Sequence, residues 1–262
     1  MYDFEYVKPG SVAEAVAALQ SEDAMPMSGG QTLIPTMKAR LAQASKLVDL
    51  SGVGDLVGIS VAPDSVTIKG ATTHNTVATS SDVRGVFAAL ADMASHIGDP
   101  AVRNRGTIGG SVANNDPAAC YPSACMATGA TIHTNTRQIA ADDFFQGMFD
   151  TALNEGEIVT GVSFPIPSRA NYQKFVQPAS RFAMVGVFVA QYAGGVRVGV
   201  TGASEGGVFR WTEAEAALSA NFSADAVPAA LSADGMIGDI HGSPEYRAHL
   251  VHVMTKRAVA AA

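Results

Sequence analysis

Hydrophobic and polar residues alternate in short runs at the start of this chain, and the runs predict small mixed elements. Residues 2–7 alternate as a strand, and the segment 11–14 (Ser-Val-Ala-Glu) has the form of a capping box that opens a helix through Leu19. Further apolar runs predict a strand over 24–27, a helix over 33–41 and a strand over 46–49. This β-α-β-α-β order favours a small, partly parallel sheet.

The middle of the chain predicts strands and helices of similar size. Two β-branched runs flank Pro63-Asp64-Ser65, which is typical of a hairpin turn. A polar, β-branched stretch over 72–79 leads into a predicted helix. The predicted strands are 57–62, 66–69, 130–133, 139–140 and 158–164, and the predicted helices are 86–96 and the second part of 112–126.

The pattern changes after the proline-containing segment 165–170, which is the best candidate for a domain boundary. Strands are predicted over 172–176, 185–192 and 196–201, with Gly194-Gly195 as a hairpin turn. Helices are predicted over 212–220, 224–231 and from 243 to the end. We therefore predict an α+β protein with one domain over 1–168, made of subdomains at about 1–55 and 56–168, and a second over 169–262.

Composition limits the classes of partner. The chain has 262 residues and a net charge of −7 with no basic block, which argues against nucleic acid and anionic membranes as partners. Arg103 and Arg105 are a local pair that could still serve one phosphate. Charged residues make up only 16%, against roughly 25% in typical domains. We favour a permanent partner that covers part of the surface over a simple Ala and Gly bias.

The cysteines and histidines predict no metal site on this chain. Cys120 and Cys125 do not form a C-x-x-C motif, so we expect buried, inert thiols rather than a cluster or zinc site. The six histidines are scattered without metal-ligand spacing. The start has no secretory pattern, and no apolar run is long enough to span a bilayer. We expect a soluble, cytoplasmic protein.

Glycine pairs in two segments carry the strongest chemical signal. Residues 28–35 read Ser-Gly-Gly-Gln-Thr-Leu-Ile-Pro, and residues 105–111 read Arg-Gly-Thr-Ile-Gly-Gly-Ser. A glycine pair allows positive φ and close approach of the backbone to a ligand, and the exposed amides can hold an anion. A single pair is most often only a surface turn, and neither segment is a GxGxxG or P-loop motif. Both together predict a bound phosphate or pyrophosphate.

The two segments also resemble a known family. Residues 28–35 are similar to the first flavin-binding motif, and residues 102–117 to the second, of the FAD-carrying medium subunits of molybdenum hydroxylases. This family includes aerobic carbon monoxide dehydrogenases and xanthine dehydrogenases. Residues 242–250 are similar to the helix opening of its C-terminal domain. The resemblance implies a two-subdomain FAD-binding domain of the vanillyl-alcohol oxidase-like flavoprotein type, followed by an α+β domain with an antiparallel sheet covered by helices.

The resemblance implies which residues hold FAD. The two glycine turns would hold the pyrophosphate, and the hydroxyls of Ser28, Thr32, Thr107 and Ser111 would supply donors in place of lysine or arginine. Asp116 would accept from a ribose hydroxyl, with a turn or capping role as the equal alternative. The cofactor-binding residues implied by the two motifs are Met27, Ser28, Gly29, Gly30, Gln31, Thr32, Leu33, Thr107, Gly109, Gly110, Ser111, Asn114 and Asp116.

Residues near the flavin ring follow less directly from the resemblance. Ile158, Val159, Lys174 and Phe175 occupy the matching positions, and for each of them an ordinary strand position is the competing interpretation. Cys120 is a departure, because relatives often carry an acidic residue there. If that acid contacts the cofactor, this chain has lost one hydrogen bond.

The resemblance implies an electron-transfer subunit with no catalytic residue of its own. A large partner would carry the molybdenum cofactor and a small one two [2Fe–2S] clusters, in a dimer of heterotrimers. FAD here would collect electrons for an external acceptor such as a quinone, a cytochrome or NAD, and peripheral contact with a membrane acceptor is compatible with this. The alternatives are a stand-alone flavin oxidase of the same fold and a non-redox nucleotide-binding scaffold. The chain has no hydrolase motif.

Overall fold

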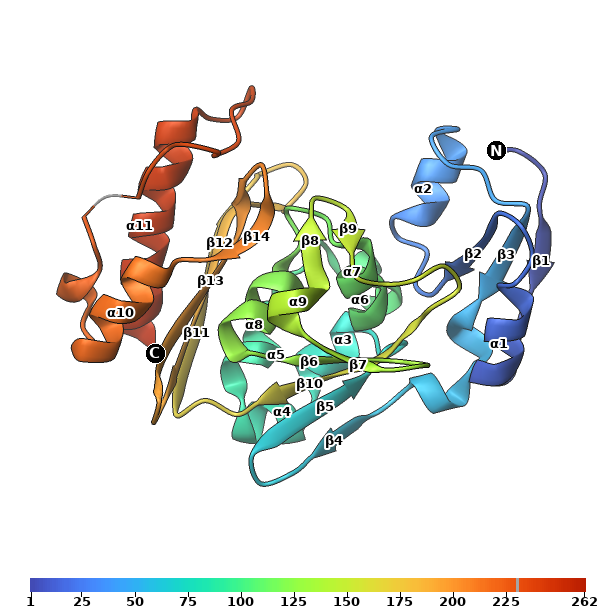
Figure 1. Ribbon diagram of the computed structural model, residues 1–262, viewed down its shortest axis with the longest axis horizontal. Helices are drawn as coiled ribbons and strands as arrows, with labels where there is room; N and C mark the ends of the chain where they lie inside the picture. Colours follow the sequence, from blue (N-terminus) through green and yellow to red (C-terminus); the bar gives the residue numbers. More distant parts are fainter. Residues whose placement is uncertain (230) are drawn as a thin grey trace.

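The computed structural model describes residues 1–229 and 231–262. The described strands form a 3-stranded, a 5-stranded and a 4-stranded sheet and a 2-stranded ribbon. Figure 1 shows the N-terminal sheet at one end of the molecule, the C-terminal sheet with its helices at the other, and a helix-rich part between them. The order of these parts in space therefore follows their order in the sequence.

The N-terminal part confirms the predicted β-α-β-α-β opening. Its strands lie in the order β1-β3-β2 and all pair in parallel. The first helix begins where expected, because the Ser11 side chain accepts from the amide of Glu14 at 3.2 Å. The elements are β1 (Glu5–Val7), α1 (Val12–Ala18), β2 (Ala24–Met27), α2 (Leu33–Lys38) and β3 (Lys46–Asp49), followed by the 3-10 turns Leu50–Gly52 and Gly54–Leu56.

The middle part is an antiparallel sheet, and a block of helices is inserted in the sequence between its strands β5 and β6. The strand order is β4-β5-β10-β6-β7, and β10 lies at the centre. The strands are β4 (Ile59–Val61), β5 (Ser65–Lys69), β6 (Thr131–Thr134), β7 (Gln138–Ala140) and β10 (Val159–Pro165). The helices are α3 (His74–Thr79), α4 (Ser81–Val86), α5 (Ala88–Ser95), α6 (Pro100–Arg105), α7 (Ile108–Asn114), α8 (Cys120–Thr128) and α9 (Ala141–Phe144), and the ribbon is β8 (Phe145–Gly147) with β9 (Asp150–Thr151).

One helix of this block begins later than predicted. The predicted helix over 86–96 begins only at Ala88, because Phe87 takes φ −147° and ψ 64° and separates α4 from α5. The Phe87 ring is 3% exposed and meets Phe188 edge-on at 6.0 Å between ring centroids. Burial of this aromatic side chain therefore outweighs the helical pattern of its neighbours.

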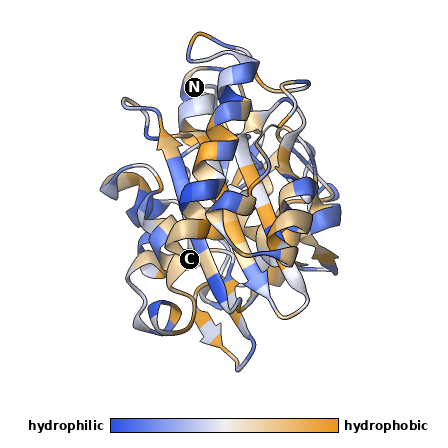
Figure 2. Ribbon diagram, turned by 90° about the vertical axis from the view of Figure 1, so that its left-hand side faces the viewer, coloured by the Kyte–Doolittle hydropathy of each residue, from blue (hydrophilic) through white to orange (hydrophobic). Residues whose placement is uncertain are grey.

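The C-terminal sheet is an antiparallel meander in the order β11-β12-β13-β14. Its strands are β11 (Arg169–Val176), β12 (Ala183–Tyr192), β13 (Gly195–Ser204) and β14 (Gly207–Arg210), of which β14 was not predicted. The first eight residues of β12 are buried, since α11 (Pro244–Ala261) packs on one side of the sheet and α8 on the other. Figure 2 faces the α11 side and shows mixed hydrophilic and hydrophobic residues on the helices in front.

Two helices were predicted correctly after this sheet and one was not. The predicted helix over 212–220 is α10 (Thr212–Ala220), and the one from 243 is α11. The predicted helix over 224–231 is reduced to a 3-10 turn at Ala224–Ala226, and its position 230 lies outside the described residues. Pro228 follows this turn, and proline removes a helix donor. The chain leaves the middle sheet at Pro165 and enters the C-terminal sheet at Arg169. The division of the chain into two domains stays a prediction.

Candidate functional site

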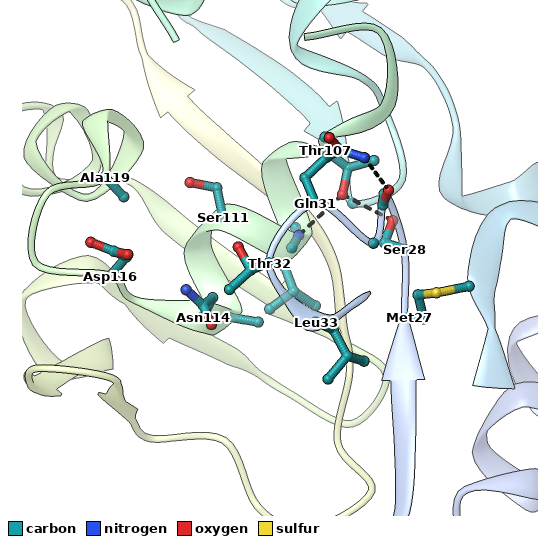
Figure 3. Close-up of a pocket in the computed structure, with 18 of the residues that line it drawn as sticks. Met27, Ser28, Gln31, Thr32, Leu33, Thr107, Ser111, Asn114, Asp116 and Ala119 are labelled. Atoms are coloured by element: carbon teal, nitrogen blue, oxygen red, sulfur yellow. Dashed lines mark hydrogen bonds between the residues drawn. The ribbon is translucent and has the colours of Figure 1, made fainter. Parts of the chain in front are cut away.

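A cavity of about 800 Å³ runs between the N-terminal and middle parts and reaches the C-terminal sheet. Both glycine segments line it, together with the start of β10 and one residue of β11. Figure 3 shows Ser28 and Thr107 side by side, with Ser111, Asn114 and Asp116 farther along. The volume is in the range of cofactor and ligand pockets, about 300–1,000 Å³.

The first glycine segment presents free main-chain amides to this cavity. Strand β2 ends at Met27, the chain turns at Gly30 with φ 70°, and α2 begins at Leu33. Within the described part of the chain, the amides of residues 29–33 donate to no protein acceptor. The Thr32 hydroxyl likewise has no hydrogen-bond partner there. Consecutive free amides around a left-handed residue form a concave site for an anion.

The second segment differs from the prediction, because its glycines lie inside a helix. Gly109 and Gly110 belong to α7, and neither has positive φ. The amides of Ile108 and Gly109 donate to the carbonyls of Thr72 and Gly70 at 3.1 and 2.8 Å, and that of Gly110 donates to the Thr107 hydroxyl at 3.2 Å. These amides are therefore used by the protein, and we correct the expectation that they are free for an anion.

The glycines of the second segment provide space instead. A Cβ on Gly109 would lie 2.6 Å from the carbonyl oxygen of Gly70, so this position needs glycine for packing. Gly110 is exposed toward the cavity, and a Cβ there would have only the Thr107 hydroxyl within 3.4 Å. At 110 the protein opposes a side chain only through this hydroxyl, which would have to shift by a few tenths of an ångström, whereas a ligand pressed against this helix would require glycine.

The two segments touch each other. The Thr107 hydroxyl donates to the Ser28 hydroxyl at 2.9 Å, which is a contact across 79 positions of the chain. A Cβ on Gly29 would collide with the carbonyl oxygen of Arg105 and lie 2.7 Å from Cα of Gly106. Glycine at 29 therefore lets the two turns meet in one wall of the cavity.

A buried asparagine turns the chain after α7. Asn115 ends the helix in the left-handed region with φ 42°, and its amide nitrogen donates to the carbonyls of Gly147 and Asp150 at 2.7 and 2.8 Å. Its neighbours Asn114 and Asp116 both line the cavity. Burial raises the pKa of the Asp116 carboxyl, although the Ala118 amide donates to it at 2.8 Å. Because Asp116 lines the cavity, a ligand donor there would stabilise the charged form that burial disfavours.

Lys174 on β11 marks the end of the cavity nearest the C-terminal sheet. Its ammonium donates to the carbonyl oxygen of His96 at 3.0 Å and to Sγ of Cys120 at 3.4 Å. Phe175 does not line the cavity: it packs in the C-terminal core and meets the Tyr246 ring edge-on. Successive strand residues point to opposite faces, so Lys174 and Phe175 could not both face the ligand.

His74 is a cavity residue that the sequence analysis took for an ordinary histidine. The side chain is 5% exposed, its ring lies 5.5 Å from that of Tyr121, and Nδ1 has no hydrogen-bond partner. Burial lowers the pKa of His74 to about 4, and Arg103 adds to this effect. A Cβ on Gly106 would lie 2.7 Å from Nε2, so the neutral imidazole packs directly behind the second segment.

The remaining predicted site residues can be placed in the same way. Of the predicted cofactor residues, all except Phe175 line the cavity, and Met27 also packs in a small hydrophobic cluster with Met37 and Leu47. Arg103 and Arg105 do not line it, and Arg103 donates to the carbonyls of Ile97 and Gly98. Lining residues that were not predicted include Gly70, Ala71, Gly98, Asp99, Gly156, Glu157, Ala179, Ser180, Arg181 and Phe182.

The described residues contain neither a cluster of metal ligands nor a helix able to span a membrane. Across residues 1–229 and 231–262, no group of three or more His, Cys, Asp or Glu side chains is placed to hold a metal ion. In the same residues, none of the helices combines the length and the apolar character needed to cross a membrane. Both cysteines are buried and unbonded, as predicted.

Comparison with known proteins identifies the family. Residues 2–167 match the family described as "FAD binding domain in molybdopterin dehydrogenase". The chain belongs to this family. It is 33% identical to the carbon monoxide dehydrogenase medium chain of Afipia carboxidovorans, over 98% of this chain and 95% of that one. It is 34% identical to the nicotine 6-hydroxylase medium subunit of Paenarthrobacter nicotinovorans, over 97% and 95%.

Solved structures agree with this assignment. A carbon monoxide dehydrogenase structure from Hydrogenophaga pseudoflava superposes with a TM-score of 0.89 at 32% identity, covering 100% of this chain and 97% of that one. Quinoline 2-oxidoreductase from Pseudomonas putida 86 gives 0.89 at 29% identity, with the same coverage. The predicted family, fold class and FAD cofactor are therefore confirmed, and the chain is an FAD-binding subunit of an oxidoreductase.

Proposed function

We propose that the cavity holds one extended FAD, with its pyrophosphate against the amides of residues 29–33. The observation that carries this proposal is that these amides have no acceptor among the described residues and belong to the wall of the cavity where the two glycine segments meet. Neither glycine segment brings a lysine or arginine side chain to the cavity lining, so at this wall a buried diphosphate would be held mainly by N–H and O–H donors. The segment fits that requirement.

The remaining residues divide by their position along the cavity. The hydroxyls of Ser28, Thr32, Thr107 and Ser111 would supplement the amides. Gly110 would leave space for the phosphate oxygens, and Asn114 and Asp116 would hydrogen-bond the sugar. Val159 and Lys174 would lie beside the ring, while Phe175 is left out of the site. The full proposed set is Met27, Ser28, Gly29, Gly30, Gln31, Thr32, Leu33, Thr107, Gly109, Gly110, Ser111, Asn114, Asp116, Val159 and Lys174.

We further propose that the chain is the electron-transfer subunit of a molybdenum hydroxylase complex. The support is its similarity over nearly the full length to medium chains and subunits of such enzymes. Bound FAD supplies the ability to accept electrons singly and release them in pairs. The chain's own residues bind and orient the cofactor and exclude water from it.

The partners follow from the same proposal. A large subunit would carry the molybdenum cofactor and bind substrate, and a small subunit would carry two [2Fe–2S] clusters, in a dimer of heterotrimers in the cytoplasm. The external acceptor would be a quinone, a cytochrome or NAD, reached where necessary by peripheral contact with a membrane. The low share of charged residues, 16%, is consistent with a surface covered by subunits.

A cofactor analysis tests the first part of this proposal. The full chain is purified and denatured, and the released nucleotide is identified by mass; we expect FAD close to one per chain. A colourless chain that fails to take up added FAD would contradict the proposal. Mixing the loaded chain with candidate substrates tests the second part: rapid reduction of the flavin without partner subunits would indicate a stand-alone oxidase.

A further inference from the structure

The end of the cavity at the C-terminal sheet holds a lysine in a fixed position. Lys174 lies opposite Gly186 in the pairing of β11 with β12, and its ammonium is held by the His96 carbonyl at 3.0 Å and by Sγ of Cys120 at 3.4 Å. Two acceptors on different elements restrict the side chain, so its charge has a defined place in the cavity wall.

Among the described residues, no carboxylate lies within ion-pair distance of this ammonium. Among the ion pairs of the described residues, which extend to 4.0 Å, none involves Lys174. The acidic residues that line the cavity are Asp99, Asp116 and Glu157, and Glu157 is already paired with Arg137 at 3.0 Å. Cys120 occupies the space beside the ammonium where a carboxylate would pair with it.

The surroundings of Cys120 keep this arrangement rigid. Tyr172 lies two residues before Lys174 on the same face of β11, is 6% exposed, and has a buried hydroxyl without a hydrogen-bond partner. A Cβ on Gly186 would collide with that hydroxyl, so glycine makes room for it. Burial raises the pKa of the Tyr172 phenol and the neighbouring Cys120 adds to this effect, while Lys174 donates to Sγ of Cys120. We call these three residues, Cys120, Tyr172 and Lys174, the Lys174 cluster.

We propose that the Lys174 cluster raises the midpoint potential of the bound flavin, because Lys174 carries a positive charge that Cys120 leaves unneutralised. This inference rests on the proposed function, with the ring at this end of the cavity. Reduction adds two electrons and one proton to the neutral ring and leaves one negative charge on it. A fixed cation stabilises that product more than the oxidised ring and so favours reduction. Lys174 is thus a positioning and tuning residue, not an acid or base.

The decisive experiment compares two isosteric substitutions at position 120. Cys120→Asp introduces a carboxylate beside Lys174, and Cys120→Asn introduces the same shape without charge. Each full-length variant is loaded with FAD and reduced stepwise with dithionite beside a reference dye. We expect Cys120→Asp to lower the equilibrium constant for reduction at least tenfold relative to Cys120→Asn, which is about 30 mV for a two-electron couple. Lys174→Met should also lower the equilibrium constant for reduction, relative to the wild type.

A remote lysine provides the control. Lys256 lies on α11 beside the exposed Asp225, and Lys256→Met should leave the potential unchanged because solvent screens that charge. Equal potentials for Cys120→Asp and Cys120→Asn, with FAD bound in both, would overturn this inference and leave the proposed function standing. Failure of the wild-type chain to bind FAD would overturn both. If Lys174→Met loses FAD, the comparison of Cys120→Asp with Cys120→Asn still tests the inference.

Discussion

The two glycine segments are similar in sequence but have different roles in the structure. The first, residues 28–35, turns at Gly30 with φ 70° and leaves the amides of 29–33 without acceptors among residues 1–229 and 231–262. The second, residues 105–111, has helical glycines whose amides already donate to Gly70 and Thr107. One segment therefore offers donors to a ligand, and the other offers space and hydroxyl groups.

This difference shows that a missing Cβ can serve three separate purposes in one cavity. Gly30 is needed for its left-handed backbone, and Gly29 and Gly109 for close packing against other main chain. Gly110 meets neither need, since it has no positive φ and no main-chain atom near its Cβ position, where the nearest atom is the Thr107 hydroxyl at 3.1 Å. Only this last glycine is explained by the ligand alone, so substitutions at these positions should separate binding from stability.

The largest effect is expected at the contact between the two segments. Gly29→Ala would drive a methyl group into the carbonyl of Arg105, and the wall of the cavity must open to accept it. We expect FAD retention to fall more than a hundredfold and stability to fall by about 1–3 kcal/mol, the usual range for overpacking. Absorbance of the bound flavin and urea unfolding would measure the two effects.

A matched glycine controls this experiment. The Cβ position of Gly54 has no atom within 4 Å, so Gly54→Ala should retain both FAD and stability. Normal flavin content in Gly29→Ala would show that the two turns do not need to meet for binding.

The imidazole behind the second segment predicts a dependence of stability on pH. Burial lowers the pKa of His74 to about 4 in the folded chain, whereas an unfolded histidine titrates near 6.5. Between these values the unfolded chain binds more protons, so this histidine costs stability as the pH falls from 6.5 to 4, by about 3 kcal/mol in all. His74→Gln should remove that part of the acid sensitivity, as measured by urea unfolding at pH 7.5, 6 and 4.5.

A second histidine, His133, serves as a comparison for the effect of His74→Gln on the pH dependence of stability. Partial burial also lowers the pKa of His133, which is hydrogen-bonded to Ser163 and lies outside the cavity lining. His133→Gln should therefore flatten the same curve by less. An unchanged slope in His74→Gln would contradict the buried, neutral state of this ring.

Gly110 separates binding from stability most cleanly. Gly110→Ala should change stability by no more than about 1 kcal/mol, because the preference of alanine for the helix opposes the close contact of its Cβ with the Thr107 hydroxyl at 3.1 Å. It should weaken FAD binding roughly tenfold, since the methyl group occupies ligand space, and Gly110→Val should abolish retention. Gly85 in α4 has an open Cβ position with no atom within 4 Å, so Gly85→Ala should stabilise the chain without affecting FAD. Unaltered affinity in Gly110→Ala would remove the ligand as the reason for this glycine.

The smallest effect concerns the hydroxyl pair that joins the segments. Thr107 donates to Ser28 at 2.9 Å and caps α7 by accepting from Gly110. In the chain without FAD, a double-mutant cycle of Ser28→Ala and Thr107→Val should give a coupling energy of about 0.5–1.5 kcal/mol. Strictly additive losses would mean that the two hydroxyls do not interact in solution.

Much of the architecture was predictable because local signals and tertiary packing agree. The capping residue Ser11 and the alternating strands of the C-terminal meander gave elements close to those observed. Signals failed where burial decides the backbone: Phe87 divides a predicted helix because its ring is buried against Phe188. The short strand β14 pairs along β13 and carries no pattern of its own.

The sequence predicted which segments form the site, but it predicted the roles of their individual residues less well. The motifs brought the predicted residues to one cavity, apart from Phe175, which strand alternation turns to the other face. The sequence could not show that the amides of Gly109 and Gly110 are used internally, because their acceptors lie on other segments, such as Gly70. The role of His74 depends in the same way on Gly106 and Tyr121, which pack against it only in three dimensions.

A map of the full chain loaded with FAD, by crystallography or cryo-EM, tests the central claim most directly. The account predicts pyrophosphate oxygens within hydrogen-bond distance of the amides of residues 29–33, with α7 approaching them through Gly110 and the Thr107 and Ser111 hydroxyls. A diphosphate bound elsewhere in the molecule, or facing those amides only through solvent, would contradict it.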